Sequence, residues 1–524
     1  MPRRTFRTPG VYIEEIGSIP PAVAPVETAI PAFVGYTPQA SDRGISVLNK
    51  AKRITSLLEC ETIFGYASNT NASDPNSRQD PQYYLVESAG QRPSQPTLTI
   101  AGKHYLLQPD PDTVYYLYPS IRLFFQNGGK TAYIVSIGTY GPASGASASP
   151  GATITNCNVS IKALQKGLKI LESEKQVTLY AFPDASLLPS AENGIIIREA
   201  LAQNERLGNS MSIIDVAEGA RRNPQNSQTD IDSFRNRIGS NGLRNGAAYY
   251  PFLDTTILDR EDLSYNNLFG GDVKKLIDIL SPANDPNPEV VRILKDIVRS
   301  SKRKTSFKQY HDKLLSASSA YQAIMDSMLQ EVNRLPPSGA LAGVFVANDE
   351  RTGVWKAPAN IALTGVSKPT IQVDQPTQEY MNIDPTSGRS VNAIRSIPRR
   401  GVIPWGARTL DSNDPESRYI SARRTIQFIE SSCTPAIRGF AFEENVPSTW
   451  KNIETVIENF LLMIWRQGGL AGSKASEAFS VRCGLNTSMT SQDITNGELI
   501  VIVGISLTRP AEFTVLTLRQ KIAQ

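Results

Sequence analysis

The sequence predicts a mixed α+β protein with several domains and an extended strand at each end of the chain. Its 524 residues are enough for roughly two to four domains with ample cores. Helical and strand patterns alternate through residues 161–216, which is typical of a sheet covered by helices. Strand patterns also lie at residues 8–16 and 513–518, near the two chain ends. Together these observations predict an α/β body that carries extended terminal arms.

The two terminal strand patterns predict strand exchange between copies of the chain. Extended backbone needs hydrogen-bond partners, and proteins ordinarily blunt an exposed strand edge. A chain that offers a strand at each end is suited to adding those strands to the sheets of its neighbours. Residues 20–31, rich in Pro, Ala and Val, indicate a stiff connector behind the first strand. The predicted intersubunit strand residues are Val11, Tyr12, Ile13, Phe513, Val515, Leu516 and Leu518.

Periodicity places the elements between the arms. A helix around residues 121–125 leads through the turn Asn127-Gly128-Gly129 into a strand at 132–137. Residues 67–119 indicate a surface excursion with one hairpin at 98–107, and residues 262–334 a charged helical block. Further helices are predicted at 161–171, 195–204, 273–280, 289–299, 310–333, 416–431 and 448–466, and strands at 32–36, 176–181, 211–216, 479–485 and 499–507.

Composition argues against several classes of function. A formal net charge of only +4 with 20% charged residues gives no concentrated basic field for nucleic acid. The four cysteines lack CxxC spacing, so they predict buried thiols rather than a zinc site or a disulfide framework. Two histidines in polar stretches, expected at the surface, argue against hydrolytic triads and catalytic metal sites. We therefore expect no catalytic, metal or cofactor site. The residues concerned are Cys60, Cys157, Cys433, Cys483, His104 and His311.

Nothing in the sequence predicts a leader or a membrane span. Residues 1–6 are basic but have no apolar core behind them, so they do not resemble a secretory signal peptide. The longest apolar run, near residues 499–507, is too short to cross a bilayer as a helix. We expect the chain to be made and kept in the cytosol, without membrane insertion.

Several motifs, in order along the chain, resemble those of contractile tail sheath proteins. The central one is the string from Ala342 to Asn360, AGVFVANDERTGVWKAPAN. The others are Thr8 to Glu15 (TPGVYIEE), Phe124 to Gly129 (FFQNGG), Ala248 to Leu253 (AYYPFL) and Trp405 to Leu410 (WGARTL). The resemblance covers both termini and the centre of the chain, and leaves residues 67–119 and 262–334 as departures.

The resemblance implies a structural subunit that polymerises as a helical sleeve and contracts without nucleotide hydrolysis. Implied partners are further copies of the chain, an inner tube protein, baseplate and terminal cap proteins, and sheath paralogues. The long helical insertion favours an extracellular injection particle over a minimal bacteriocin. The expected domains are an arm at 1–25, an outer α/β region at 26–380, a tube-facing α+β core at 381–508 and a strand arm at 509–524.

A sleeve must grip its tube weakly, and local charge pairing would suit that role. Arg423 and Arg424, on the predicted helix at 416–431, are the tube-facing candidates. Adjacent helical residues point in different directions, so at most one would face the tube. The alternative is that both are solvated or paired within the subunit.

Enzymatic interpretations of the sequence are weak. Gly129-Lys130-Thr131 resembles the end of a phosphate-binding loop, but Phe124 stands where that loop requires glycine. Asp349, Glu350 and Arg351 are expected in a strand or turn, where neighbouring side chains diverge. The alternative function from another class is a carbohydrate- or receptor-binding surface protein that uses residues 67–119 for recognition.

Overall fold

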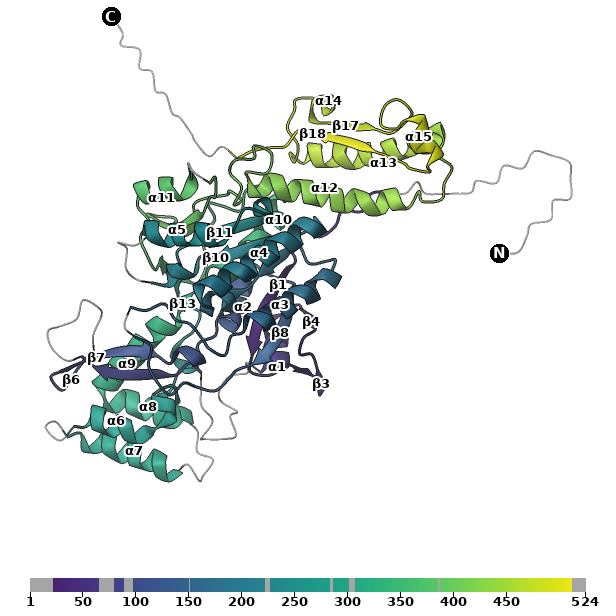
Figure 1. Cartoon of the computed structure of the whole chain (residues 1–524). Helices are drawn as coiled ribbons and strands as arrows, with labels where there is room; N and C mark the ends of the chain where they lie inside the picture. The colour runs from purple at the N-terminus through teal and green to yellow at the C-terminus, as the bar shows by residue number, and fades with distance from the viewer. Residues whose placement is uncertain are drawn as a thin grey trace, which may run out of the picture. The chain divides into compact units, whose positions relative to one another are not determined.

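A computed structural model describes residues 22–65, 80–88, 98–149, 151–221, 227–282, 286–300, 307–384 and 387–510. These residues form two compact units, each described here by itself (Figure 1). The larger unit begins at Glu27 and runs to Phe428, and the smaller unit holds residues 22–26 and 429–508. The C-terminal unit therefore begins later than residue 381. The reason is that residues 392–404 form two strands of the large sheet, as described next.

The larger unit is built on an eight-stranded sheet in the order β16-β15-β11-β10-β9-β1-β8-β4. The six central strands pair in parallel, and the edge strands β4 and β16 are antiparallel. Side chains of β1, β9, β10 and β11 are buried throughout, as expected for a parallel sheet covered on both faces. The strands are β1 (Pro31–Thr37), β4 (Ala51–Ile54), β8 (Ala132–Thr139), β9 (Leu179–Ala181), β10 (Met211–Asp215), β11 (Gly246–Tyr250), β15 (Asn392–Ile397) and β16 (Gly401–Pro404).

Helices pack directly on β1, β8, β9 and β10 of this sheet, and the predicted alternation of helices and strands is confirmed. They are α2 (Leu117–Gln126), α3 (Ile161–Ile170), α4 (Ser190–Leu207) and α10 (Ser338–Thr352). Other elements of the larger unit are β2 (Ser41–Asp42), β3 (Ile45–Ser46), α1 (Leu57–Phe64), α5 (Ser227–Arg237), β12 (Leu253–Thr255), β13 (Arg334–Leu335), β14 (Val366–Pro369) and α11 (Gln375–Asn382). The strand or turn expected around Asp349 is wrong, because residues 349–351 lie in the last turn of α10.

Two glycines one helical turn apart let α10 lie against α2. A Cβ on Gly339 would lie 2.3 Å from the carbonyl oxygen of Ser120, and a Cβ on Gly343 would lie 2.5 Å from that of Phe124. Both obstacles are backbone atoms of α2, which cannot rotate away as a side chain would. Close backbone approach is one reason for glycine inside a helix despite its low propensity.

Gly339→Ala is therefore expected to destabilise the larger unit. The added methyl forces α10 and α2 apart, and overpacking of this kind costs about 1–3 kcal/mol. The measurement is the urea midpoint of the purified chain. A midpoint equal to that of the wild type would show that α10 and α2 can separate without loss of stability.

The two departures from the family pattern, far apart in sequence, share one hydrophobic core. Helix α9 (Ser319–Val332) packs on the hairpin of β6 (Leu98–Ile100) and β7 (Lys103–Pro109), beside β5 (Tyr83–Glu87) (Figure 1). The remaining helices of this subdomain are α6 (Val273–Leu280), α7 (Pro288–Ser300) and α8 (Phe307–Ala317). The hairpin and the helices are confirmed, but the excursion ends earlier than residue 119, because Leu117 already belongs to α2 and to the main core.

Two of the expectations for single side chains are wrong. His311 is buried in this subdomain, where its Nδ1 lies 2.9 Å from the hydroxyl of Tyr321, and burial lowers the pKa of the ring. Cys157 is an exposed thiol, whereas the other three cysteines are buried as predicted.

The smaller unit joins helices to a two-stranded sheet. It contains the second half of α12 (Ile420–Arg438), followed by α13 (Pro447–Arg466), α14 (Ala475–Ala478), β17 (Phe479–Arg482), α15 (Ser491–Thr495) and β18 (Ile502–Ile505). The predicted apolar face of the helix at 448–466 is confirmed. Its buried residues include Ile453, Val456, Ile457, Phe460 and Ile464.

Candidate assembly site

The sheet of the smaller unit has two strands, and within the described residues neither outer edge is paired with another strand. β17 and β18 are antiparallel, with Phe479 opposite Ile505 and Val481 opposite Val503. A two-stranded sheet is marginal by itself in water and gains stability from further strands. Open edges of this kind are also the sites at which extended peptides add to a sheet.

The register determines which backbone groups point outward. Ser506 donates its N–H to the carbonyl oxygen of Ala478, so this pair and every second pair along the ladder are hydrogen-bonded. The alternate residues therefore direct their N–H and C=O groups away from the partner strand. On β18 these outward residues are Val503 and Ile505, and on β17 they are Phe479 and Val481.

The two edges differ in how many amides they leave open. On the β17 side, the N–H of Phe479 bonds to the carbonyl of Ala475, and the N–H of Cys483 bonds to Oε1 of Glu454 at 3.0 Å. Val481 is left as the open amide of that edge. On β18 the outward amides of Val503 and Ile505 have no bond to another described residue. The β18 edge is therefore better prepared to receive an added strand.

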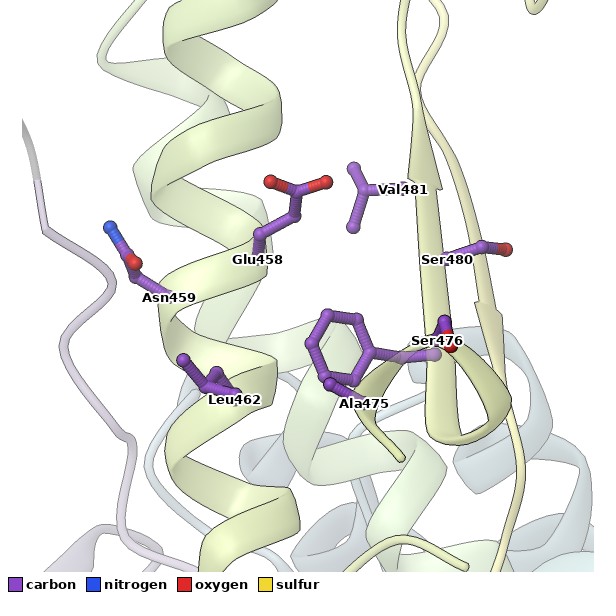
Figure 2. Close-up of a pocket in the computed structure, with 8 residues that line it drawn as sticks. Glu458, Asn459, Leu462, Ala475, Ser476, Ser480 and Val481 are labelled. Atoms are coloured by element: carbon purple, nitrogen blue, oxygen red, sulfur yellow. The ribbon is translucent and has the colours of Figure 1, made fainter. Parts of the chain in front are cut away.

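A groove of 490 Å³ lies between α13 and β17 (Figure 2). The carboxylate of Glu458 and the side chain of Val481 point into it from opposite sides, and Phe479 also lines it. Leu462 adds a further apolar surface from α13. The groove combines apolar walls with one carboxylate, which suits the side chains of a docked segment.

Exposed apolar side chains are concentrated in the smaller unit. Of the twelve large apolar side chains exposed in the described part of the chain, five belong to this unit, although it is much the smaller of the two. Exposed apolar groups that gather in one region commonly mark a contact surface. The five residues are Phe442, Met463, Leu485, Ile500 and Ile502.

The arginines predicted to face a tube are instead buried within the chain. Arg423 is 7% exposed, and its Nε donates to Oδ1 of Asn245 at 2.9 Å. Arg424 is 3% exposed and makes a bidentate ion pair with Asp349, with N–O distances of 2.9 and 2.6 Å. This burial speaks against the tube-facing role, because neither guanidinium is offered to a partner. It favours the alternative, in which both are paired within the subunit.

The seven predicted intersubunit strand residues lie outside the described residues, so their role remains a prediction. They are Val11, Tyr12, Ile13, Phe513, Val515, Leu516 and Leu518. What the sequence patterns did not reveal is that the edges of the two-stranded sheet are open. The strands at 479–485 and 499–507 were predicted only as elements of the C-terminal α+β core.

Two buried carboxylates lie at the carboxyl ends of the parallel strands, where α/β proteins commonly bind ligands. Asp184 accepts backbone N–H bonds from Tyr36, Tyr116 and Leu117 at 2.7–3.1 Å. Asp215 accepts the N–H and the hydroxyl of Ser338 at 2.7 and 2.6 Å. Burial raises the pKa of Asp184 to about 6 and that of Asp215 to about 7. Both side chains thus hold the first turns of the chain's own helices α2 and α10.

The described residues contain no group of three or more His, Cys, Asp or Glu side chains placed to hold a metal ion. Among the same residues, no helix combines the length and the apolar character needed to span a bilayer.

Comparison with solved structures shows that the chain has the fold of contractile sheath subunits. The contracted helical sheath of the anti-feeding prophage (AFP) is 25% identical, with a TM-score of 0.57 over 99% of this chain and 100% of that one. The six-fold symmetrised AFP baseplate structure contains a chain that is 24% identical, with the same TM-score and coverage. The contracted PVC sheath of an extracellular contractile injection system is 22% identical, with a TM-score of 0.57 over 99% of each chain.

These matches confirm the resemblance to contractile tail sheath proteins that the motifs predicted. The similarity extends over nearly the whole chain, so it includes the two segments that depart from the family motifs. No family model and no curated protein sequence matches the chain.

Proposed function

We propose that this protein is the structural subunit of a contractile sheath in a phage-tail-like injection particle. The subunit polymerises as a helical sleeve around an inner tube and shortens to drive that tube through a target envelope. The observation that carries this proposal is the fold, which matches the AFP and PVC sheath structures from end to end. The receptor-binding alternative has no such support, since residues 80–88 and 98–109 contribute to one hydrophobic core with the helices of residues 262–334.

The terminal arms would join the subunits by adding strands to the sheet of the smaller unit. The open β18 edge, the marginal two-stranded sheet and the exposed apolar side chains around it support this role. Main-chain bonds between strands tolerate modest rotation of the bodies they join, so a lattice connected in this way can shorten without dissociating. Shortening would draw on the additional surface buried between contracted subunits, without nucleotide hydrolysis.

Assembly would need the inner tube protein, a baseplate and a terminal cap, and would take place in the bacterial cytoplasm before release of the particle. The role is structural rather than catalytic. In support, the buried carboxylates at the usual ligand edge of the sheet are occupied by the chain's own backbone amides and the Ser338 hydroxyl.

Removing the arms is expected to abolish polymerisation while leaving the folded subunit intact. Chains lacking residues 1–18 or 509–524 should give less than about a tenth of the wild-type polymer. The full-length double variant Val11→Pro/Ile13→Pro should show the same loss, because proline removes the N–H groups that strand pairing requires. Sedimentation and negative-stain microscopy measure this. Arg3→Ala/Arg4→Ala, outside the predicted strand, is the matched control.

The wild-type chain should form long tubes that occur in extended and shortened forms. Discrete globular oligomers in place of tubes would contradict the sheath function itself. Normal tubes from the arm variants would contradict only the strand-exchange mechanism.

A further inference from the structure

A buried ionic cluster holds the chain where it leaves the larger unit toward the N-terminal arm. In the ion pair of Arg424 and Asp349, the side chains are 3% and 4% exposed. Arg424 Nη2 also donates to the backbone carbonyl of Thr28 at 2.8 Å. The hydroxyl of Thr28 donates to Oδ2 of Asp349 at 2.6 Å. Each member of this trio is thus bonded to the other two.

Two further side chains complete what we call the arm-root cluster: Thr28, Thr178, Phe345, Asp349 and Arg424. Thr178 donates its hydroxyl to the Thr28 carbonyl at 2.8 Å, and accepts the N–H of Ile30 at 2.9 Å. The guanidinium of Arg424 lies over the ring of Phe345, 4.9 Å from its centroid. All of these residues belong to the larger unit.

The position of the cluster in the chain is unusual. The backbone passes between the two units at residues 26 and 27 and again, inside the continuous helix α12, at residues 428 and 429. Thr28 lies next to the first passage, and Arg424 lies one helical turn before the second. A single ion pair therefore ties together, on the larger unit, two of the covalent connections to the smaller one, the third being the step from Thr508 to Arg509.

Stability alone does not account for such a pair. A buried ion pair is often no more stabilising than apolar side chains of similar volume, because both charges lose their hydration. What apolar residues cannot reproduce is the set of bonds to Thr28. These bonds fix the backbone of residues 27–30. That segment belongs to no helix or strand and lies directly before β1, which begins at Pro31.

We propose that the arm-root cluster is the mechanical anchor of the N-terminal arm, and that it fixes the connections at residues 26–27 and 428–429 to one point of the larger unit. This proposal rests on the sheath function, in which the arm passes tension between subunits. Arg424 and Asp349 are positioning residues in this scheme: they act through Thr28. When a neighbour pulls on the arm, the pull reaches the large sheet through Arg424, Asp349 and Thr178 and does not unravel residues 27–30.

The test replaces the ion pair by apolar side chains of similar volume, in Arg424→Met/Asp349→Leu. Backbone hydrogen exchange is measured on the unassembled full-length chain. We expect exchange in residues 27–30 to rise at least tenfold, with the thermal midpoint of the chain close to that of the wild type. Thr28→Val removes only the hydroxyl that donates to Asp349. It should raise exchange in residues 27–30 about threefold, which corresponds to part of the free energy of one hydrogen bond.

A second ion pair in the same unit provides the matched control. Arg237 and Glu218 are also bidentate and buried, with side chains 9% and 5% exposed, but neither lies near a passage between the units. Arg237→Met/Glu218→Leu should leave exchange in residues 27–30 unchanged. Equal increases in both double variants would show general loosening of the unit and would overturn the proposal.

The remaining outcomes are also decisive. If hydrogen exchange at residues 27–30 is unchanged in Arg424→Met/Asp349→Leu, the anchor proposal is overturned. If that double variant does not fold, Thr28→Val decides in the same way. In assembly, sheaths of the Arg424→Met/Asp349→Leu chain should break into pieces several-fold shorter than wild-type sheaths when they contract, whereas sheaths of the control should not. Absence of tubes from the wild-type chain would contradict the sheath function and leave the exchange result to decide the anchor separately.

Discussion

Replacing Asp184 with alanine is expected to lower the free energy of unfolding of the larger unit by about 3–5 kcal/mol, because it leaves buried amides without an acceptor. Asp184 is fully buried, and its two oxygens accept the backbone N–H groups of Tyr36, Tyr116 and Leu117. It thereby joins the carboxyl end of β1 to the first turn of α2. The carboxylate lies so close to β1 that position 35 requires glycine, since a Cβ there would lie 2.4 Å from Oδ2.

Urea unfolding, followed by hydrogen exchange in α2, measures this effect. Asp184→Asn is the matched variant: it keeps the volume and one acceptor oxygen for Tyr116 and Leu117, but presents an N–H₂ group to the N–H of Tyr36. The free energy of unfolding should therefore fall less for Asp184→Asn than for Asp184→Ala. A change below about 1 kcal/mol for Asp184→Ala, the size of one ordinary hydrogen bond, would show that the amides find other partners.

Local sequence patterns were sufficient for most single elements of this fold. The apolar face of α13 was predicted from spacing alone, since Ile453, Val456, Ile457, Phe460 and Ile464 recur at helical intervals and are buried. The glycine turn after α2 also follows from local chemistry, because Gly128 has a φ of 97° that favours glycine. Strands β1, β8, β9 and β10 were visible because they are largely apolar, whereas β15, which carries Asn392 and Arg395, was not predicted.

What sequence could not supply were partners distant along the chain. Arg424 was predicted to be a candidate for facing a tube, but its guanidinium is buried against Asp349, which lies 75 positions earlier in the chain. Nothing in the local pattern distinguishes a buried arginine from an exposed one on the same helix. For the same reason the two inserted segments were interpreted separately, although Leu107 and Met328 pack in one core.

The strand or turn expected near Asp349 failed for a different reason. The run Ala342–Ala347 contains valine and phenylalanine, which favour strands, and only its tertiary setting decides for helix. That setting is the contact with α2, which requires glycine at positions 339 and 343 on one helical face. Packing against α2 therefore outweighed the strand propensity of the valine and phenylalanine residues in this run.

Val503→Pro is expected to reduce sheath polymer to below about a tenth of the wild-type amount, whereas Val481→Pro should reduce it much less, because proline blocks pairing only where a free N–H is needed. The two residues lie opposite each other, and both direct their N–H away from the partner strand. Neither substitution removes a bond between β17 and β18. The two variants close different edges of the sheet, and Val481 is the more deeply buried of the two side chains.

The measurement is the pelleted fraction after assembly, together with circular dichroism of the unassembled chain to confirm folding. Val503 belongs to the edge with two adjacent open amides, while the edge of Val481 is already partly closed by Ala475 and Glu454. A greater loss from Val481→Pro would mean that the incoming strand enters through the groove beside α13. Equal and complete loss would mean that both edges receive strands, one from each kind of arm. No loss from either variant would place the contacts between subunits away from this sheet.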